Sequence, residues 1–538
     1  MVTTKISRLV NLSMFKNEYS WGTAVKENTT DEFHQKFDTA LSEVKNDLGK
    51  DYPIIINGKK IHLSEKYEVK SPADTNIILG RISNCSKVET KQAVDASKAA
   101  FEEWRSTQYQ SRAKVFKECA DSFSSKKFYL AALMSIENGK NRYEAIGDVD
   151  EAIDFMRFYA YQLELNKGFE KETAHPNPDE KTKVTLKPYG VWGIISPFNF
   201  PSAIAIGMTT AALITGNTTV LKPSYYTPIS SFKFVEEIYE KIPAGAINFV
   251  TGRGDVLGQA LMENSDVSGI AFTGSVEVGM ACYHKFIRDA VKPFVCEMGG
   301  KNPVIVTQFG NLDKAANGVL NAAFGYGGQK CSACSRVYVH KSIYAKFNEM
   351  LKNKTADLKI GLPWKKEVFL GPLIHENAYK RFKKVLEIAK RDGEIIVEGS
   401  MLEGPEFQNG YYVQPTIVSQ LPHDHELMKD ELFLPLICVN EYDSFDKVIQ
   451  LANESEFGLT AGIFSENENE LSKFFDKIEA GLLYANRDSS ATTGALVQIQ
   501  PFVGWKKSGI TGKGAGGENY LQQFMRAQTQ TRCERINE

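Results

Sequence analysis

A cysteine among glycines and small polar residues is the strongest sign of chemistry in this sequence. The segment GGQKCSACSR covers residues 327–336 and places Cys331 between Lys330 and Ser332. A thiol nucleophile requires access, a polarised environment and a nearby base. An isolated cysteine is more often an inert core residue, and Cys331 could also pair with Cys334 in a redox or zinc motif. The sequence has no second CxxC motif and no clustered histidines, so we expect no metal site.

A carboxylate in an apolar setting is the second candidate. Glu297 lies in the segment CEMGGKNPVIV, between the apolar run PFV and a predicted core strand. A carboxylate held there has a raised pKa and can act as a base near neutral pH. A glutamate before two glycines could also lie in a solvated turn.

A neutral amide is the third candidate. Asn199 stands between two phenylalanines in the segment SPFNFP, at the end of an apolar run. An amide N–H at that point could stabilise an oxyanion that develops during a reaction. The alternative is an asparagine whose hydrogen bonds are satisfied within a turn.

Several turn motifs follow apolar runs and are candidates for binding a dinucleotide. Gly252, Gly254 and Gly258 in VTGRGDVLGQAL depart from the usual spacing of a dinucleotide motif and are weak evidence alone. The segment FTGSVEVG, residues 272–279, follows the apolar GIAF and should open a helix, whose free amides could face a pyrophosphate. Lys222 in VLKPS ends another predicted strand at the same edge of the sheet.

The elements that must position these residues begin with a polar arm. Residues 1–52 are mostly polar, with a predicted helix near 32–48. The segment YPIIINGKKI predicts two short strands around an Asn57-Gly58 turn. Apolar residues recur at helical spacing over residues 88–162, which predicts a helical layer. The segment KETAHPNPDEK that follows predicts a polar loop.

From residue 182 onward, strands and helices alternate. The runs VWGIIS, TTVLKP, INFVTG and GIAFTG each end in turn residues and precede a helical window. Repeated βα units predict a parallel sheet with a nucleotide site at the carboxyl ends of its strands. A second alternation begins near residue 302, with NPVIVT, SRVYVH, GYYVQPTIV and PLICVNEY as its strands.

Composition narrows the functional classes. A chain of 538 residues with 42% hydrophobic residues predicts two or three folded units. The net charge of −2 gives no electrostatic reason to expect nucleic acid or an anionic membrane as a partner. Residues 191–221 lack charge, but prolines, asparagines and a glycine interrupt them, which favours a buried strand, loop and helix over a membrane span. Eight thinly spread cysteines indicate reduced thiols and a cytoplasmic protein.

Taken together, these motifs resemble the aldehyde dehydrogenase superfamily. The order of the Asn in SPFNFP, the Lys in LKPS, the Gly-Ser in FTGS, the Glu in EMGGK, the Cys in GQKC and a later E-x-F-x-P segment matches the family from about residue 50 to the end. The resemblance implies that Cys331 attacks an aldehyde, that Asn199 and the Cys331 amide hold the oxyanion, and that Glu297 activates water.

The resemblance also implies a cofactor and its contacts. The cofactor would be NAD, with NADP possible. Lys222 would contact the adenosine ribose, Ser275 the pyrophosphate and Glu431 the nicotinamide ribose. The remaining cofactor-binding residues that the resemblance implies are Ser196, Gly254, Gly274 and Phe433.

The fold implied is α/β and aldehyde dehydrogenase-like, with a Rossmann-type cofactor domain, an α/β catalytic domain and a small β oligomerisation segment. We expect an N-terminal arm and helical part of the cofactor domain at 1–169, a bridging and oligomerisation segment at 170–188, a Rossmann-type part at 189–298, a catalytic domain at 299–507, and a C-terminal return at 508–538. A homo-oligomer is expected.

Within the superfamily, the segment YANRDSSATTGALVQIQPFVGWKKSG resembles the Δ1-pyrroline-5-carboxylate dehydrogenases, which oxidise L-glutamate-γ-semialdehyde to L-glutamate in proline and ornithine catabolism. The resemblance implies that Gly494, Ala495 and Ser332 hold the substrate carboxylate and that Phe200 and Phe502 flank its chain. An amide nest with a hydroxyl suits a carboxylate. A dehydrogenase for another carboxylate-bearing semialdehyde, or a non-catalytic protein on the same fold, are the alternatives.

Three positions depart from the family pattern. Tyr225 replaces the glutamate of KPxE, which in the family disfavours a 2′-phosphate, and leaves the choice between NAD and NADP open. Leu434 and Val503 each replace a glycine near the expected site. We expect these two bulkier residues to tighten the pocket or to shift its loops.

Overall fold

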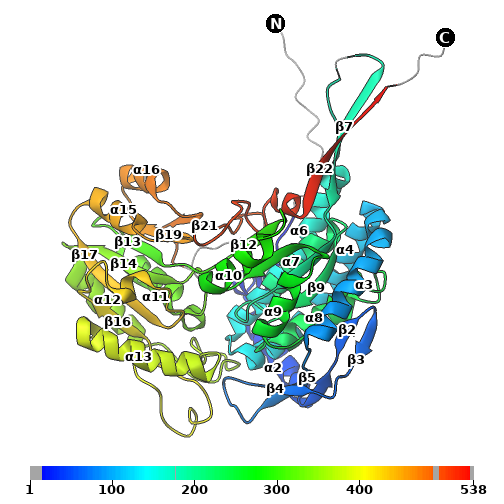
Figure 1. Cartoon of the computed structure of the whole chain (residues 1–538). Helices are drawn as coiled ribbons and strands as arrows, with labels where there is room; N and C mark the ends of the chain where they lie inside the picture. The colour runs from blue at the N-terminus through cyan, green and yellow to red at the C-terminus, as the bar shows by residue number, and fades with distance from the viewer. Residues whose placement is uncertain (1–14, 176, 489–495, 534–538) are drawn as a thin grey trace, which may run out of the picture.

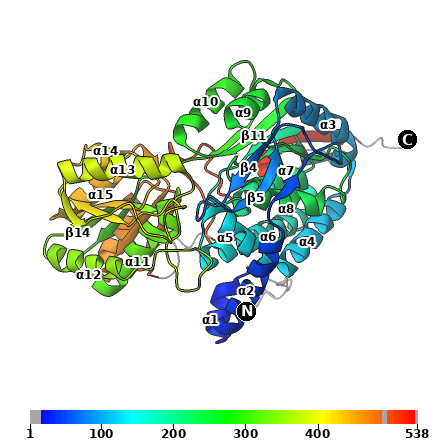
Figure 2. The same ribbon diagram turned by 90° about the horizontal axis from the view of Figure 1, so that it is seen from below.

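A computed structural model describes residues 15–175, 177–488 and 496–533. The chain forms two α/β lobes that lie side by side, with a narrow β arm that projects from one of them (Figures 1 and 2). The first lobe is built mainly from residues before 300 and the second mainly from residues after 300. The predicted α/β class with two alternating units is confirmed.

The N-terminal part contains two helices and a short hairpin. Helices α1 (Ser20–Lys26) and α2 (Thr30–Asn46) precede strands β2 (Ile54–Ile56) and β3 (Lys59–Ile61). The turn between these strands has φ of 52° at Asn57 and 69° at Gly58, a left-handed pair that favours Asn-Gly. The predicted helix and hairpin are both confirmed, and the hairpin joins the edge of the first large sheet through β2 and β10.

The predicted helical layer consists of four helices. They are α3 (Lys87–Ser106), α4 (Tyr109–Ser125), α5 (Lys127–Asn138) and α6 (Arg142–Leu165). Asn141 caps α6 by accepting hydrogen bonds from the amides of Tyr143 and Glu144, so the polar asparagine fixes where the helix begins. Gly139, with φ of 82°, ends α5 two residues before this cap. The short connection directs the first turn of α6 toward the second lobe, where Asn141 also binds the Phe369 carbonyl.

The first large sheet has the order β12-β11-β8-β9-β10-β2-β3. Its parallel strands are β8 (Val191–Ile195), β9 (Thr218–Lys222), β10 (Ile247–Phe249), β11 (Val267–Thr273) and β12 (Phe294–Glu297). The helices that alternate with them are α7 (Ala203–Ile214), α8 (Pro228–Ile238), α9 (Gly254–Glu263) and α10 (Val276–Ile287). The uncharged stretch 191–221 is the buried strand, loop and helix that its interruptions predict. Among the described residues, no helix has the length and apolarity that crossing a membrane requires.

The second large sheet has the order β15-β16-β17-β14-β13-β19-β20. Its strands are β13 (Asn302–Val306), β14 (Cys334–His340), β15 (Glu394–Val397), β16 (Thr416–Ser419), β17 (Leu436–Tyr442), β19 (Thr460–Phe464) and β20 (Leu482–Ala485). The main helices around it are α11 (Leu312–Phe324), α12 (Tyr344–Ala356), α13 (Glu376–Asp392), α15 (Phe445–Asn453) and α16 (Glu468–Lys477).

The strand predicted at GYYVQPTIV is shorter than expected. Only Thr416–Ser419 pairs in the sheet, because Pro415 has no amide N–H to donate and ends the ladder there.

Three strands form the projecting arm. Strands β6 (Glu170–Glu172) and β7 (Glu180–Pro188) pair with each other, and β22 (Met525–Cys533) pairs antiparallel with β7 along its whole length. The polar loop predicted over residues 171–181 is therefore shorter, because both of its ends extend into strands. Figure 1 shows β7 and β22 leaving the body of the molecule together.

Candidate active site

The nucleophile segment is a tight, glycine-rich turn between α11 and β14. Gly327 and Gly328 have φ of 65° and 67°, a conformation that favours glycine. A Cβ on Gly328 would lie 2.5 Å from the Leu434 carbonyl oxygen. Asn302 at the start of β13 then ties the turn down, because its amide nitrogen donates to the carbonyls of Cys331 (2.8 Å) and Ala333 (2.9 Å).

The two cysteines of the motif have different environments. Both are free thiols, and Cys334 is buried on β14 with its sulfur 3.7 Å from the Arg336 carbonyl oxygen. Cys331 stands just before the strand and is partly exposed. Burial raises the pKa of the Cys331 thiol, and the carboxyls of Glu431 and Glu297 raise it further, whereas backbone amides at Ser332 and Cys331 lower it.

Glu297 is the last residue of β12. One carboxylate oxygen accepts a hydrogen bond from the Gly504 amide at 3.1 Å. Burial raises the pKa of Glu297 well above its ordinary value, and the single hydrogen bond from Gly504 opposes this shift. The apolar surroundings that the sequence predicts for this carboxyl are therefore present.

Asn199 joins the first lobe to the nucleophile segment. It lies in the loop after β8, is 3% exposed, and its amide nitrogen donates to the Gln329 carbonyl at 3.1 Å. Gln329 is itself fixed, since its side chain donates to Tyr326 and Pro372 carbonyls and accepts from the Ile374 amide. Asn199 therefore contacts the nucleophile segment at Gln329, two positions before Cys331.

The ends of β8 and β9 form a polar edge. Lys222 ends β9, and its ammonium nitrogen lies 3.6 Å from the point where a Cβ on Gly254, the first residue of α9, would stand. Burial lowers the pKa of Lys222 to about 8. Ser196 donates its amide to the Lys222 carbonyl, and its buried hydroxyl has no hydrogen-bond partner among the described residues. This edge therefore offers a hydroxyl and an ammonium group to a ligand.

The N-terminus of α10 lies near the same edge. Ser275 caps this helix by accepting from the Val278 amide at 3.4 Å. Gly274 precedes it, and the Gly274 amide donates to the Glu297 carbonyl at 3.2 Å. One turn therefore links the candidate phosphate site to the candidate base.

Glu431 and Phe433 come from the second lobe. Glu431 accepts a hydrogen bond from the Gly300 amide at 3.0 Å, and burial raises its pKa to about 7. A Cβ on Gly299 would meet the Glu431 carboxyl at 2.1 Å, so glycine there lets the carboxyl keep this position. Phe433 has φ of 56° and packs edge-to-face on Phe198 with ring centroids 5.9 Å apart.

The predicted substrate residues are described in part. Phe200 follows Asn199 and packs against the ammonium group of Lys140, which lies 3.6 Å from its ring centroid. Phe502 exchanges two backbone hydrogen bonds with Ala515, and Ser332 is buried directly after the nucleophile. Gly494 and Ala495 lie outside the described residues.

The two bulky departures have different consequences. Leu434 is 4% exposed and belongs to the hydrophobic core of the second lobe, so its side chain packs into that core. Val503 precedes Gly504, the donor to Glu297, and its carbonyl oxygen would lie 1.9 Å from a Cβ on Gly481.

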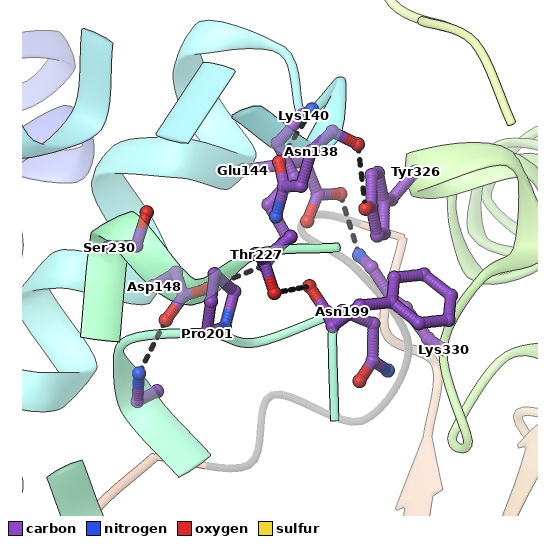
Figure 3. Close-up of polar contacts among 12 residues, drawn as sticks. Asn138, Lys140, Glu144, Asp148, Asn199, Pro201, Thr227, Ser230, Tyr326 and Lys330 are labelled. Atoms are coloured by element: carbon purple, nitrogen blue, oxygen red, sulfur yellow. Dashed lines mark hydrogen bonds and ion pairs between the residues drawn. The ribbon is translucent and has the colours of Figure 1, made fainter. Parts of the chain in front are cut away.

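The sequence did not single out three charged residues behind the site. Lys140, just before α6, forms a buried ion pair with Asp148, and Glu144 in the first turn of α6 forms one with Lys330 (Figure 3). Their signal was present in part, because two acids four positions apart lie on one face of the predicted helix, and acids on a face that becomes buried are costly unless both have partners.

Comparison with known proteins places these features in a family. Residues 60–530 match the model of the aldehyde dehydrogenase family. The 1-pyrroline-5-carboxylate dehydrogenase of Oceanobacillus iheyensis is 36% identical over 524 residues, which are 96% of this chain and 99% of that protein. The 1-pyrroline-5-carboxylate dehydrogenase 2 of Bacillus subtilis is 37% identical over 502 residues, which are 92% and 95% of the two chains.

A solved structure agrees. The 1-pyrroline-5-carboxylate dehydrogenase from Thermus with bound NAD superposes with a TM-score of 0.91 at 30% identity, covering 97% of this chain and all of that one. The chain therefore belongs to the aldehyde dehydrogenase family and is an NAD(P)-dependent aldehyde dehydrogenase of the type that these relatives represent.

Proposed function

We propose that the protein oxidises L-glutamate-γ-semialdehyde to L-glutamate with NAD⁺, through a thiohemiacetal on Cys331. The observation that supports it most is the meeting of Cys331, Glu297 and Asn199 from three separate segments at one point between the lobes. The names of relatives that match nearly the whole chain support the choice of substrate.

The residues divide the reaction into two halves. The Cys331 thiolate attacks the aldehyde carbon, and the oxygen that gains negative charge accepts hydrogen bonds from the Cys331 amide and from Asn199. Asn199 has two N–H groups, of which one binds Gln329. A nicotinamide bound at the polar edge of the first sheet would supply the hydride acceptor that this oxidation requires, and Cys331 would then hold the oxidised carbon as a thioester. Glu297 takes a proton from water as that water attacks the thioester, and the carboxylate product and the thiol separate.

The polar edge of the first sheet fits a dinucleotide. The buried Ser196 hydroxyl without a described partner, the Lys222 ammonium and the amides at Ser275 can meet its ribose and phosphate groups. Tyr225 stacks on Tyr67 with ring centroids 4.0 Å apart and planes 13° from parallel, so its ring has a fixed place beside β4 (Lys66–Lys70). With no carboxylate at position 225, we propose NAD as the working cofactor and measurable activity with NADP.

The substrate carboxylate would bind where the nucleophile segment meets the late loop. The Ser332 hydroxyl, Gly494 and Ala495 are the proposed contacts, and Phe200 and Phe502 would line the aliphatic chain. The side chains of β22 are mostly exposed, and we propose that the arm of β7 and β22 pairs with a second copy of the chain in a cytoplasmic homo-oligomer. We also propose the domain ranges given in the sequence analysis.

Replacement of Cys331 tests the nucleophile. Cys331→Ala should abolish aldehyde-dependent NADH formation while dinucleotide binding, measured by calorimetry, is retained. Cys334→Ala is the matched control, because this thiol is buried on β14 near the Arg336 carbonyl, and it should keep most of the activity. Dehydrogenase turnover by Cys331→Ala would contradict the mechanism.

Replacement of Glu297 tests the base. Glu297→Gln should leave a burst of NADH but slow the steady state, because thioester accumulates when water is not activated. Burial raises the carboxyl pKa, so in the wild type the base form, and with it deacylation, should be lost as the pH falls through a value above the ordinary carboxylate range. Loss of the burst itself would assign Glu297 to activation of the thiol instead.

Replacement of Ser332 tests the carboxylate contact. Ser332→Ala should raise KM for the semialdehyde more than for an uncharged aldehyde of similar length. A hydrogen bond to a charged group contributes about 1.5–3 kcal/mol, which corresponds to roughly a ten- to hundredfold difference. Equal effects on the two substrates would leave Ser332 with a packing role only.

Replacement of Tyr225 tests the adenosine end. A carboxylate there would repel a 2′-phosphate, so Tyr225→Glu should lower kcat/KM for NADP relative to NAD by about tenfold. The measurement is the ratio of the two kcat/KM values in the wild type and the variant. An unchanged ratio would show that residue 225 does not approach the ribose.

A further inference from the structure

The residues just before α1 bind two buried carboxylates on α6. Asp154 is 1% exposed and accepts hydrogen bonds from the Asn17 side-chain amide and the Glu18 backbone amide, both at 2.8 Å. Asp150, one turn earlier, accepts from the amide and the hydroxyl of Ser20 at 2.7 and 2.8 Å. Among the described residues, all donors to these two carboxylates come from this short segment. Because a buried carboxylate without donors is costly, the segment is an integral part of the packed structure.

Asn17 also binds a distant part of the chain. The same side-chain nitrogen that donates to Asp154 donates to the Val497 carbonyl at 2.9 Å. A side-chain amide has two N–H groups, so it can serve both acceptors at once. Val497 is buried and lies near the start of the segment 496–517, which has little regular secondary structure. One amide therefore joins this segment to α6.

The 496–517 segment is attached to α6 at a second point. The buried hydroxyl of Tyr159 accepts a hydrogen bond from the Gly516 amide at 3.0 Å. The Gln498 amide donates to the Gly516 carbonyl at 2.8 Å. Gly516 has φ of 75°, and a Cβ on it would lie 3.1 Å from the Cα of Val497. The two attachments thus belong to one closely packed region.

The same segment reaches the candidate active site. Phe502 and Ala515 exchange two backbone hydrogen bonds, at 2.9 and 2.8 Å, beside the pair of Gln498 and Gly516. Two positions after Phe502, the Gly504 amide donates to the Glu297 carboxylate at 3.1 Å. The attachment to α6 therefore helps to place a proposed wall of the substrate pocket.

We propose that Asn17 and Tyr159 are positioning residues that hold the 496–517 segment on α6 and so keep the substrate pocket in its binding-competent form. The proposal rests on the proposed function in one respect, because it takes Phe502 as part of that pocket. A segment that is loosely held is competent for only part of the time, and the apparent affinity for substrate falls by that fraction. Bound substrate orders the segment again, so turnover at saturation changes little.

The test compares two variants with a matched control in the full-length protein. Asn17→Ala removes the bridging amide, and Tyr159→Phe removes only the hydroxyl that accepts from Gly516. Ser20→Ala is the control, because it also removes a hydrogen bond to a buried carboxylate of α6. The hydrogen bonds of Ser20 go to α6 and not to the described 496–517 segment.

Hydrogen exchange followed by mass spectrometry measures the attachment. We expect the backbone amides of the 496–517 peptides to exchange about tenfold faster in Asn17→Ala and Tyr159→Phe, and at the wild-type rate in Ser20→Ala. KM for the semialdehyde should rise about tenfold in the two variants, with kcat within about twofold of the wild type. The Kd for NAD⁺, measured by calorimetry, should stay unchanged, because the polar edge of the first sheet contains neither residue.

Three outcomes overturn the proposal. Wild-type exchange in both variants refutes the attachment, and faster exchange with an unchanged KM refutes the positioning role. An equal rise of KM in Ser20→Ala would assign the effect to a general loss of stability. Exchange needs no substrate, so the two ideas fail separately. A wild type that leaves the semialdehyde unoxidised refutes the proposed substrate, and KM for an uncharged aldehyde then decides the role of Asn17 and Tyr159 in the same way.

Discussion

The thiol of Cys331 must ionise in surroundings that oppose negative charge. It is only partly exposed, so burial raises its pKa, and two carboxyls, Glu297 and Glu431, lie close enough to raise the pKa further. Removal of water strengthens each electrostatic interaction in the site, so both the opposing carboxyls and the supporting N–H groups act strongly. The other groups of the site stabilise first the thiolate and then the oxyanion in these surroundings.

The fold supplies these groups from the ends of its elements. Glu297 ends β12, Asn199 follows β8, and Ser275 begins α10, so each stands where backbone groups are left without partners in the helix or strand. The Gly274 amide bonds to the Glu297 carbonyl, and Asn199 bonds to the Gln329 carbonyl. A displacement of one of these turns would therefore move the turn that is hydrogen-bonded to it.

Much of this could be predicted from the sequence. The strands VWGIIS and GIAFTG, the Asn57-Gly58 turn and the helical layer over residues 87–165 follow from periodicity and turn residues, which are local signals. The buried carboxyl of Glu297 also follows from its apolar neighbours.

What sequence could not predict depends on contacts between distant segments. The pairs of Lys330 with Glu144 and of Asn199 with Gln329 join residues more than a hundred positions apart. Local patterns contain no information on such pairs, and a lysine or glutamate in isolation suggests a solvated surface. Leu434 was expected near the pocket because of its position in a motif, yet its side chain packs into the core.

The most direct test of the account is to find the acyl group. Glu297→Gln is mixed with the semialdehyde and NAD⁺, quenched in acid during the burst, digested and sequenced by tandem mass spectrometry. The account predicts an acyl adduct on Cys331 and none on Cys334, with an amount equal to the NADH formed in the burst. NADH formation with an unmodified Cys331, or with the adduct on another residue, would contradict it.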